Sequence, residues 1–169
     1  MRSKLGKAVR ARFAARLRGV LPQFREIKTA EIPPGSRLYC WERAPDLSFY
    51  LLLLVFPQWD EFTIEVAWSR KGQFPDRTMF CDPDEEPQDG TLGFRLGRLW
   101  EVNKGVWWQL TEYPSPAQLE RSLLTGQDVM PPVEEIMPNV IPMVDDAINR
   151  IVEYAVPYFT KVAKKYGYE

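Results

Sequence analysis

The sequence has 169 residues, of which 45% are hydrophobic and 13% aromatic, and its formal net charge is −1. A chain of this length has the size of one domain and buries roughly 70% of the surface that it exposes when unfolded, so it needs neither a disulfide nor a metal to fold. The composition excludes a disordered chain, and the near-neutral charge argues against a nucleic-acid partner.

The charge is distributed unevenly along the chain. Residues 1–28 contain nine Lys and Arg residues and one acidic residue, Glu26, whereas the rest of the chain is acidic overall. A basic first segment either docks on an acidic body or faces an anionic partner. We favour the first interpretation, with the remaining charges on a solvated helix face.

The first predicted element is a helix over residues 3–21. Apolar residues recur there at every fourth position, and arginines surround them. The stripe consists of Leu5, Val9, Phe13, Leu17 and Leu21. Pro22 permits at most one last turn, and the segment 32–35 (Ile-Pro-Pro-Gly) is a clear break before the next element.

Three strands are predicted next, over residues 37–43, 47–56 and 61–69. Residues 47–56 are apolar on both faces, which is typical of a central strand that is covered on both sides. Residues 61–69 alternate, with Phe62, Ile64, Val66 and Trp68 on one face. Pro45 and Pro57 each stand at the second position of a short turn, so the three strands form an antiparallel meander.

A polar segment over residues 70–90 follows, and we expect it to be exposed and mobile. It carries five acidic residues between positions 82 and 89, which makes it a candidate cation site. The EF-hand pattern fails because Pro87 occupies the place of the required glycine, so we predict a solvated loop and no metal. Further strands are predicted over 92–100 and 106–111, with a hairpin turn at residues 103–105 (Asn-Lys-Gly).

The last third is predicted to be helical. Ser115 and Pro116 begin one helix as N-cap and first residue. The terminal helix has the most regular apolar stripe in the chain, and Pro157 should kink it. That stripe contains Val144, Ile148, Ile151, Val152, Ala155, Phe159, Val162 and Tyr166.

These patterns together predict a single α+β domain over residues 1–169. We expect a mainly antiparallel meander of about five strands, with the N-terminal helix and two or three C-terminal helices packed on it. We expect no membrane span, because the longest apolar run in the chain extends only over residues 49–57, far short of the roughly 20 residues that a spanning helix needs.

The absence of histidine excludes several classes of chemistry. Ser–His–Asp and Cys–His catalytic systems cannot be built, nor can His-based zinc or iron sites. The phosphate-binding motifs GxxxxGK[ST] and GxGxxG do not occur, so we expect no cofactor. Cys40 and Cys81 belong to no CxxC pair and are expected to be reduced thiols in a cytoplasmic protein.

Six residues are candidates for ligand binding. Arg98 continues the apolar phase of Leu92, Phe94 and Leu96, so either a bulge at Gly97 reverses the phase or an arginine reaches across an aromatic face. Trp107 and Trp108 must point to opposite faces of a strand, so one should lie at the surface or under a helix. The candidate set is Tyr39, Glu65, Arg95, Arg98, Trp107 and Trp108.

The sequence favours a binding or interaction module, with a protein partner or a small ligand, over an enzyme. An accessory or immunity-type protein that binds another bacterial protein is one example of such a module. The order of the elements resembles that of small bacterial proteins of uncharacterised families, and this resemblance implies no catalytic activity. The alternative is an enzyme that uses carboxylate and arginine chemistry in a pocket between sheet and helices. Convergence of Tyr39, Glu65, Arg95 and Arg98 in a deep pocket would favour the enzyme, and an exposed apolar patch would favour the partner.

Overall fold

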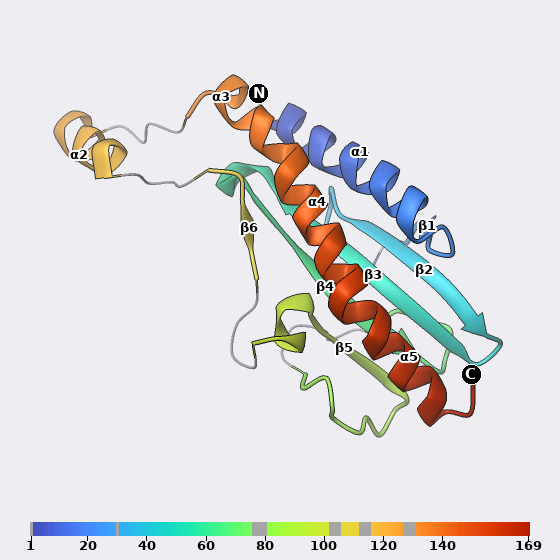
Figure 1. The fold of residues 1–169 in the computed structure, drawn as a ribbon. Helices are drawn as coiled ribbons and strands as arrows, with labels where there is room; N and C mark the ends of the chain where they lie inside the picture. Colours follow the sequence, from blue (N-terminus) through green and yellow to red (C-terminus); the bar gives the residue numbers. More distant parts are fainter. Residues whose placement is uncertain (1, 30, 76–80, 102–105, 112–115, 127–130) are drawn as a thin grey trace.

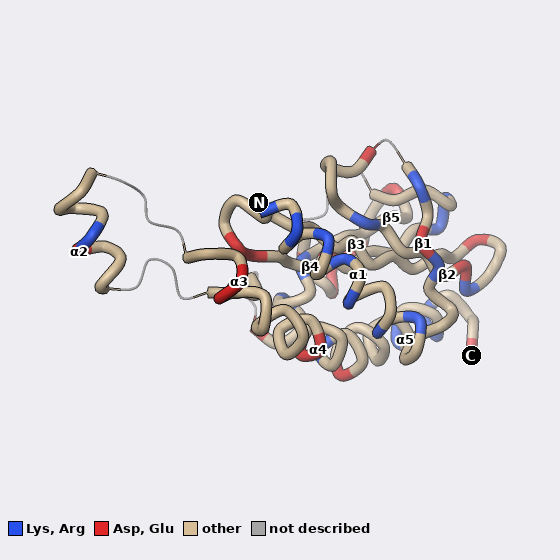
Figure 2. The backbone as a smooth tube through the Cα atoms, turned by 90° about the horizontal axis from the view of Figure 1, so that it is seen from above, with Lys and Arg blue, Asp and Glu red and all other residues tan. Residues whose placement is uncertain are grey.

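The fold consists of a layer of helices on one face of an antiparallel sheet (Figures 1 and 2). The computed structural model describes residues 2–29, 31–75, 81–101, 106–111, 116–126 and 131–169. The predicted α+β class, with its N-terminal helix, meander sheet and C-terminal helices, is confirmed. The hairpin turn expected at 103–105 lies outside the described residues.

The sheet follows the chain in order, as a meander requires. Each strand is antiparallel to its neighbour in the order β1-β2-β3-β4-β5, and β6 pairs with β4 beside Glu61 and Phe62. The bounds are β1 Arg25–Ile27, β2 Arg37–Ala44, β3 Leu47–Phe56, β4 Glu61–Ser69, β5 Thr91–Arg95 and β6 Trp108–Gln109. The short β1 has no alternating pattern of its own and was not expected.

Strand β3 is central and buried on both faces, as its continuous apolar sequence predicts. Residues 49, 51 and 53 belong to the main core, which also contains the helices. Leu38, Tyr50, Leu52, Leu54 and Ala67 form a second cluster on the opposite face, against which Ile32 and Phe74 pack. These two residues come from loops rather than helices, so loop segments cover part of the second face.

Two long helices cover the main core. Helix α1 (Ser3–Val20) buries the predicted stripe from Leu5 to Leu17, and lies beside α4 (Val140–Arg150), as Figure 1 shows. The chain continues through a π turn (Ile151–Ala155) into α5 (Val156–Lys165). Phe159 is fully buried and stacks on Phe49, with ring centroids 4.4 Å apart.

The π turn explains how the terminal helix accommodates a proline. Pro157 has no N–H for the helix ladder, and in a regular α-helix its ring would meet the carbonyl of Glu153. Five π-helical residues stand directly before α5 and shift the hydrogen-bond pattern there. Val152 was expected in the buried stripe and is exposed instead, because its neighbour Ile151 takes the inward position.

The expected strand over 92–100 is wrong beyond Arg95. Residues Leu96–Leu99 form a 3₁₀-helix, so there is no strand bulge at Gly97. Residues three apart share one side of a 3₁₀-helix, and both Leu96 and Leu99 accordingly contact the main core. The expected strand over 106–111 is shorter than predicted, since only Trp108 and Gln109 pair with β4.

The remaining helices differ in how they pack. The short α3 (Val133–Ile136) buries Val133 and Ile136. Helix α2 (Pro116–Thr125) begins at the predicted proline, yet it buries no residue and stands away from the body in Figures 1 and 2. In the ranges that the structure describes, no helix has both the length and the apolar character needed to cross a membrane.

Replacing Phe159 by Ala should lower the free energy of unfolding by about 3–5 kcal/mol, because the ring is fully buried against Phe49. The control is Lys164→Ala, since Lys164 is exposed on the same helix and its truncation should change stability by no more than about 0.5 kcal/mol. Chemical denaturation at constant slope measures both. Equal stability of the two variants would contradict the packing of α5 on the sheet.

Candidate functional site

The six predicted site residues lie in separate parts of the fold. Glu65, Arg95 and Trp107 come together on the sheet face that points away from the helices. Trp108 and Tyr39 belong to the main core on the helix side, and Arg98 lies in the 3₁₀-helix after β5. Three of the six candidates are therefore neighbours in the structure, but the six do not form one pocket.

Glu65 and Arg95 are direct cross-strand neighbours. They face each other in the register of β4 and β5, and the side chain of Glu65 is almost completely buried, with an exposed fraction of 3%. The guanidinium carbon of Arg95 lies 4.6 Å from the ring centroid of Trp107, and that ring packs on Phe56. A buried acid, an arginine and an aromatic ring thus form a compact group in one layer.

This group lies on the face opposite to the one that the enzyme hypothesis requires. Alternate residues of β4 point the same way, and Ala67, two positions from Glu65, belongs to the second cluster, which contains no helix residue. Glu61 lies on this side as well. Partial burial raises the pKa of its carboxyl, although a hydrogen bond with Gln109 and the charge of Arg95 each act to lower it. The carboxylates therefore do not line a pocket between sheet and helices.

Trp107 and Trp108 point to opposite faces, as predicted. Trp108 is buried, stacks on Phe62 with centroids 5.5 Å apart, and donates from Nε1 to Oδ2 of Asp146 in α4 at 2.9 Å. Its indole N–H is thus satisfied under a helix, which is the arrangement of a core tryptophan. Trp107 is half-buried on the other face.

Tyr39 lies in β2 at the edge of the main core, beside Phe13 of α1. Only 4% of the residue is exposed, and its hydroxyl oxygen is buried without a hydrogen-bond partner. Burial raises the pKa of this hydroxyl to about 12, so it stays protonated at neutral pH. A buried donor without an acceptor is costly, which makes Tyr39 the most unusual of the six candidates.

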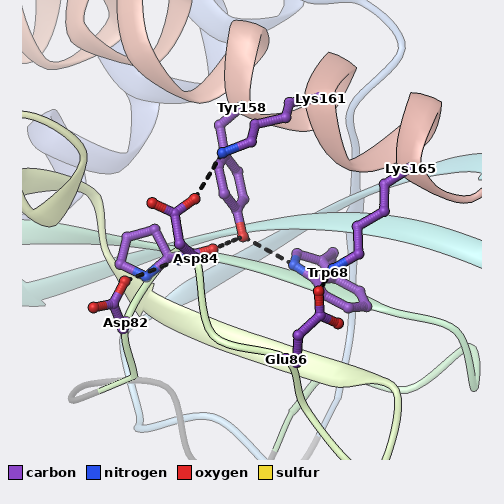
Figure 3. A network of polar contacts seen from close by, with 8 residues as sticks. Trp68, Asp82, Asp84, Glu86, Tyr158, Lys161 and Lys165 are labelled. Atoms are coloured by element: carbon purple, nitrogen blue, oxygen red, sulfur yellow. Dashed lines mark hydrogen bonds and ion pairs between the residues drawn. The ribbon is translucent and has the colours of Figure 1, made fainter.

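The acidic segment after residue 81 is attached to α5, as Figure 3 shows. The hydroxyl of Tyr158 accepts a hydrogen bond from Nε1 of Trp68 at 3.0 Å and donates one to the carbonyl of Pro83 at 2.9 Å. Tyr158 therefore joins the central sheet, the terminal helix and the loop through one buried group.

Ion pairs strengthen the same attachment. Nζ of Lys161 lies 2.7 Å from Oδ1 of Asp84, and Lys165 pairs with Glu86. Two of the clustered carboxylates thus face lysines. Over the described ranges, no group of three or more His, Cys, Asp or Glu side chains is placed to hold a metal ion. The acidic segment functions structurally in this arrangement.

Part of the basic charge of α1 is paired with acidic residues of the rest of the domain. Arg12 donates twice to Asp145 of α4, from Nε at 2.9 Å and from Nη2 at 2.7 Å, and Arg16 lies 3.5 Å from the same carboxylate. Near the start of the helix, Arg2 lies 3.1 Å from the fully buried carboxylate of Asp60. These contacts agree with the interpretation that the sequence favoured, in which a basic helix docks on an acidic body.

Helix α2 carries the largest group of exposed leucines. Leu119, Leu123 and Leu124 are 48%, 86% and 80% exposed, and no residue of the helix is buried. The sequence predicted the start of this helix but gave its leucines no special role. The sequence signal that distinguishes α2 from the packed helices lies in the neighbouring segments. These segments show no apolar periodicity, so they predict no packing that would fix α2 on the sheet.

Comparison of the chain with protein-family models, with curated proteins and with solved structures finds no match.

Replacing Asp145 by Asn should lower the free energy of unfolding by about 1 kcal/mol at pH 7, because two arginines face this carboxylate. Hydrogen bonds from Arg12 hold the pKa of Asp145 below its usual value. Because the pKa of this carboxyl is lower in the folded protein than in the unfolded chain, its ionised form stabilises the fold at pH values above the unfolded-state pKa of about 4. Protonation removes this stabilisation as the pH falls below that value. The gap between wild type and variant should therefore narrow on acidification.

Urea denaturation from pH 7 to pH 3 provides the measurement. Glu153→Gln is the matched control, since Glu153 is an exposed acid about two turns further along the same helical rod, and it should parallel the wild type at every pH. A constant gap between wild type and the Asp145 variant would show that the carboxylate does not stabilise the docking of α1.

Proposed function

We propose that the protein is a protein-binding module and that helix α2 is the element that contacts its partner. The observation that carries this proposal is the exposure of Leu119, Leu123 and Leu124 on a helix that buries nothing in its own domain. Exposed apolar side chains gathered on one element are a mark of an interaction surface.

The length of α2 supports the same function. A helix of ten residues is marginal in water by itself, and most helices are stabilised by packing of their apolar face. Because α2 has no such packing in the domain, a partner would supply it. The leucines at positions 119 and 123 are four apart and share one side of the helix, which suits insertion into an apolar groove.

A groove on a different protein fits α2 better than a second copy of the chain. A stable interface buries at least about 1,200 Å² in total. Two short helices with three exposed leucines each, packed side by side, cover much less than this. A groove surrounds the helix on several sides and buries more of each leucine.

The enzyme alternative receives less support. It requires the acid and arginine candidates to converge between sheet and helices, and Glu65 and Arg95 lie on the other face from Tyr39. We also propose a cytoplasmic location, supported by the two cysteines, which are thiols and not disulfide-bonded.

The combined substitution Leu119→Gln, Leu123→Gln and Leu124→Gln separates binding from folding. Glutamine keeps a high helix propensity, so the helix can still form. The free energy of unfolding should change by no more than about 0.5 kcal/mol, because these side chains are exposed. A loss as large as that of Phe159→Ala would mean that the leucines pack on their own domain.

Binding is measured by photo-crosslinking in the native cell. With Leu123→p-benzoylphenylalanine, we expect one discrete crosslinked protein, which disappears when Leu119 and Leu124 are changed to Gln. The same replacement at Lys164 is the control and should give no such product. A crosslink only to a second copy of the chain, or none, would contradict the proposed partner.

A further inference from the structure

A cavity of about 260 Å³ lies at the C-terminal end of α1, where the chain turns back into β1. Its apolar wall comes from α1, the turn after it and Tyr39 of β2, and includes Ala14, Leu17, Pro22 and Phe24. Arg18, Arg25 and Glu26 complete the lining with charged side chains. The cavity is thus apolar within and charged at its edge, and it stands apart from helix α2.

Tyr39, which contributes to the wall of this cavity, has a hydroxyl without a hydrogen-bond partner. Its oxygen is closed to water and forms no hydrogen bond, although almost all buried hydroxyls in proteins have one. Burial keeps the hydroxyl protonated at neutral pH, because it raises the pKa to about 12. One residue of the cavity wall therefore carries a neutral donor that lacks an acceptor.

The charge at the edge of the cavity is positive on balance. Glu26 is paired with Arg37, with 3.0 Å between Oε1 and Nε. Arg18 and Arg25 are both exposed, and neither has an ion-pair partner in the part of the chain that the structure describes. Two guanidinium groups without an ion-pair partner and one hydroxyl donor favour an acceptor that carries negative charge.

We propose that this cavity binds a small monocarboxylate with an apolar body, whose carboxylate accepts from Tyr39 and faces Arg18 and Arg25. The apolar wall takes the body of the ligand, and the three donors take its anionic end. The volume is below the roughly 300 Å³ at which pockets for drug-sized molecules begin, so the ligand is small. The occupant spreads the wall slightly to reach the hydroxyl, which is closed to water when the cavity is empty. This proposal is independent of the function assigned to α2.

A pair of tyrosine variants tests the proposal through stability. In Tyr39→Phe the unpartnered hydroxyl is removed, so the melting temperature of the ligand-free protein should rise by about 2–4 °C. Tyr158→Phe is the matched control: Tyr158 is also buried, but its hydroxyl has two partners, and its removal should lower the melting temperature. A lower melting temperature for Tyr39→Phe would mean that the hydroxyl is satisfied in the free protein, and would overturn the proposal.

Binding is measured by titration with 3-phenylpropionate and hexanoate, followed by NMR shifts of the amides of residues 14–18 and 24–26. We expect saturable binding, at least about tenfold weaker for the neutral amides of both acids and for Tyr39→Phe. Arg25→Ala should weaken binding as well, whereas Tyr158→Phe should leave it unchanged. Failure of both acids to shift these amides, or equal binding of acid and amide, would overturn the proposal.

Discussion

The structure depends on one constraint: its central strands bury both faces, but its packed helices cover only one. Tyr50, Leu52 and Leu54 point away from the helices and are nevertheless buried. Loop residues such as Ile32 and Phe74 contribute to their cover. The same face contains Glu65 beside Arg95, together with Glu61, so charged side chains lie next to the second apolar cluster. Helices α1, α4 and α5 cover the other face, and α2 buries no residue against the sheet.

Much of this fold follows from local pattern. The four-residue spacing from Leu5 to Leu17 predicts one buried face, and this is confirmed. The alternation over 61–69 also predicts one buried face, but residues 62–69 are all buried, because the polar face of this strand is covered as well. The failures arise where spacing is ambiguous. Leu96 and Leu99 fit a strand with a bulge as well as a 3₁₀-helix, and only contacts with the core decide between them. The three residues of β1 are too few to show a period.

The candidate site was predictable in composition but not in arrangement. Glu65 and Arg95 become neighbours through the register of β4 and β5, which are separated by more than twenty residues of loop. The sequence does not determine that register. Likewise, the residue type of Tyr39 says nothing of whether its hydroxyl finds a partner, and the leucines of α2 resemble core leucines until the packing is known.

A partner-binding role for α2 requires this helix to be unpacked in the isolated protein, and amide hydrogen exchange tests this most directly. In the free protein, the amides of residues 117–125 should exchange nearly as fast as those of an unstructured peptide. Amides within α1 and α4 should be protected by orders of magnitude, because their buried stripes open only in larger unfolding events. Protection of α2 equal to that of α4 would show that its leucines are packed within the domain and would contradict its function as a partner-binding helix.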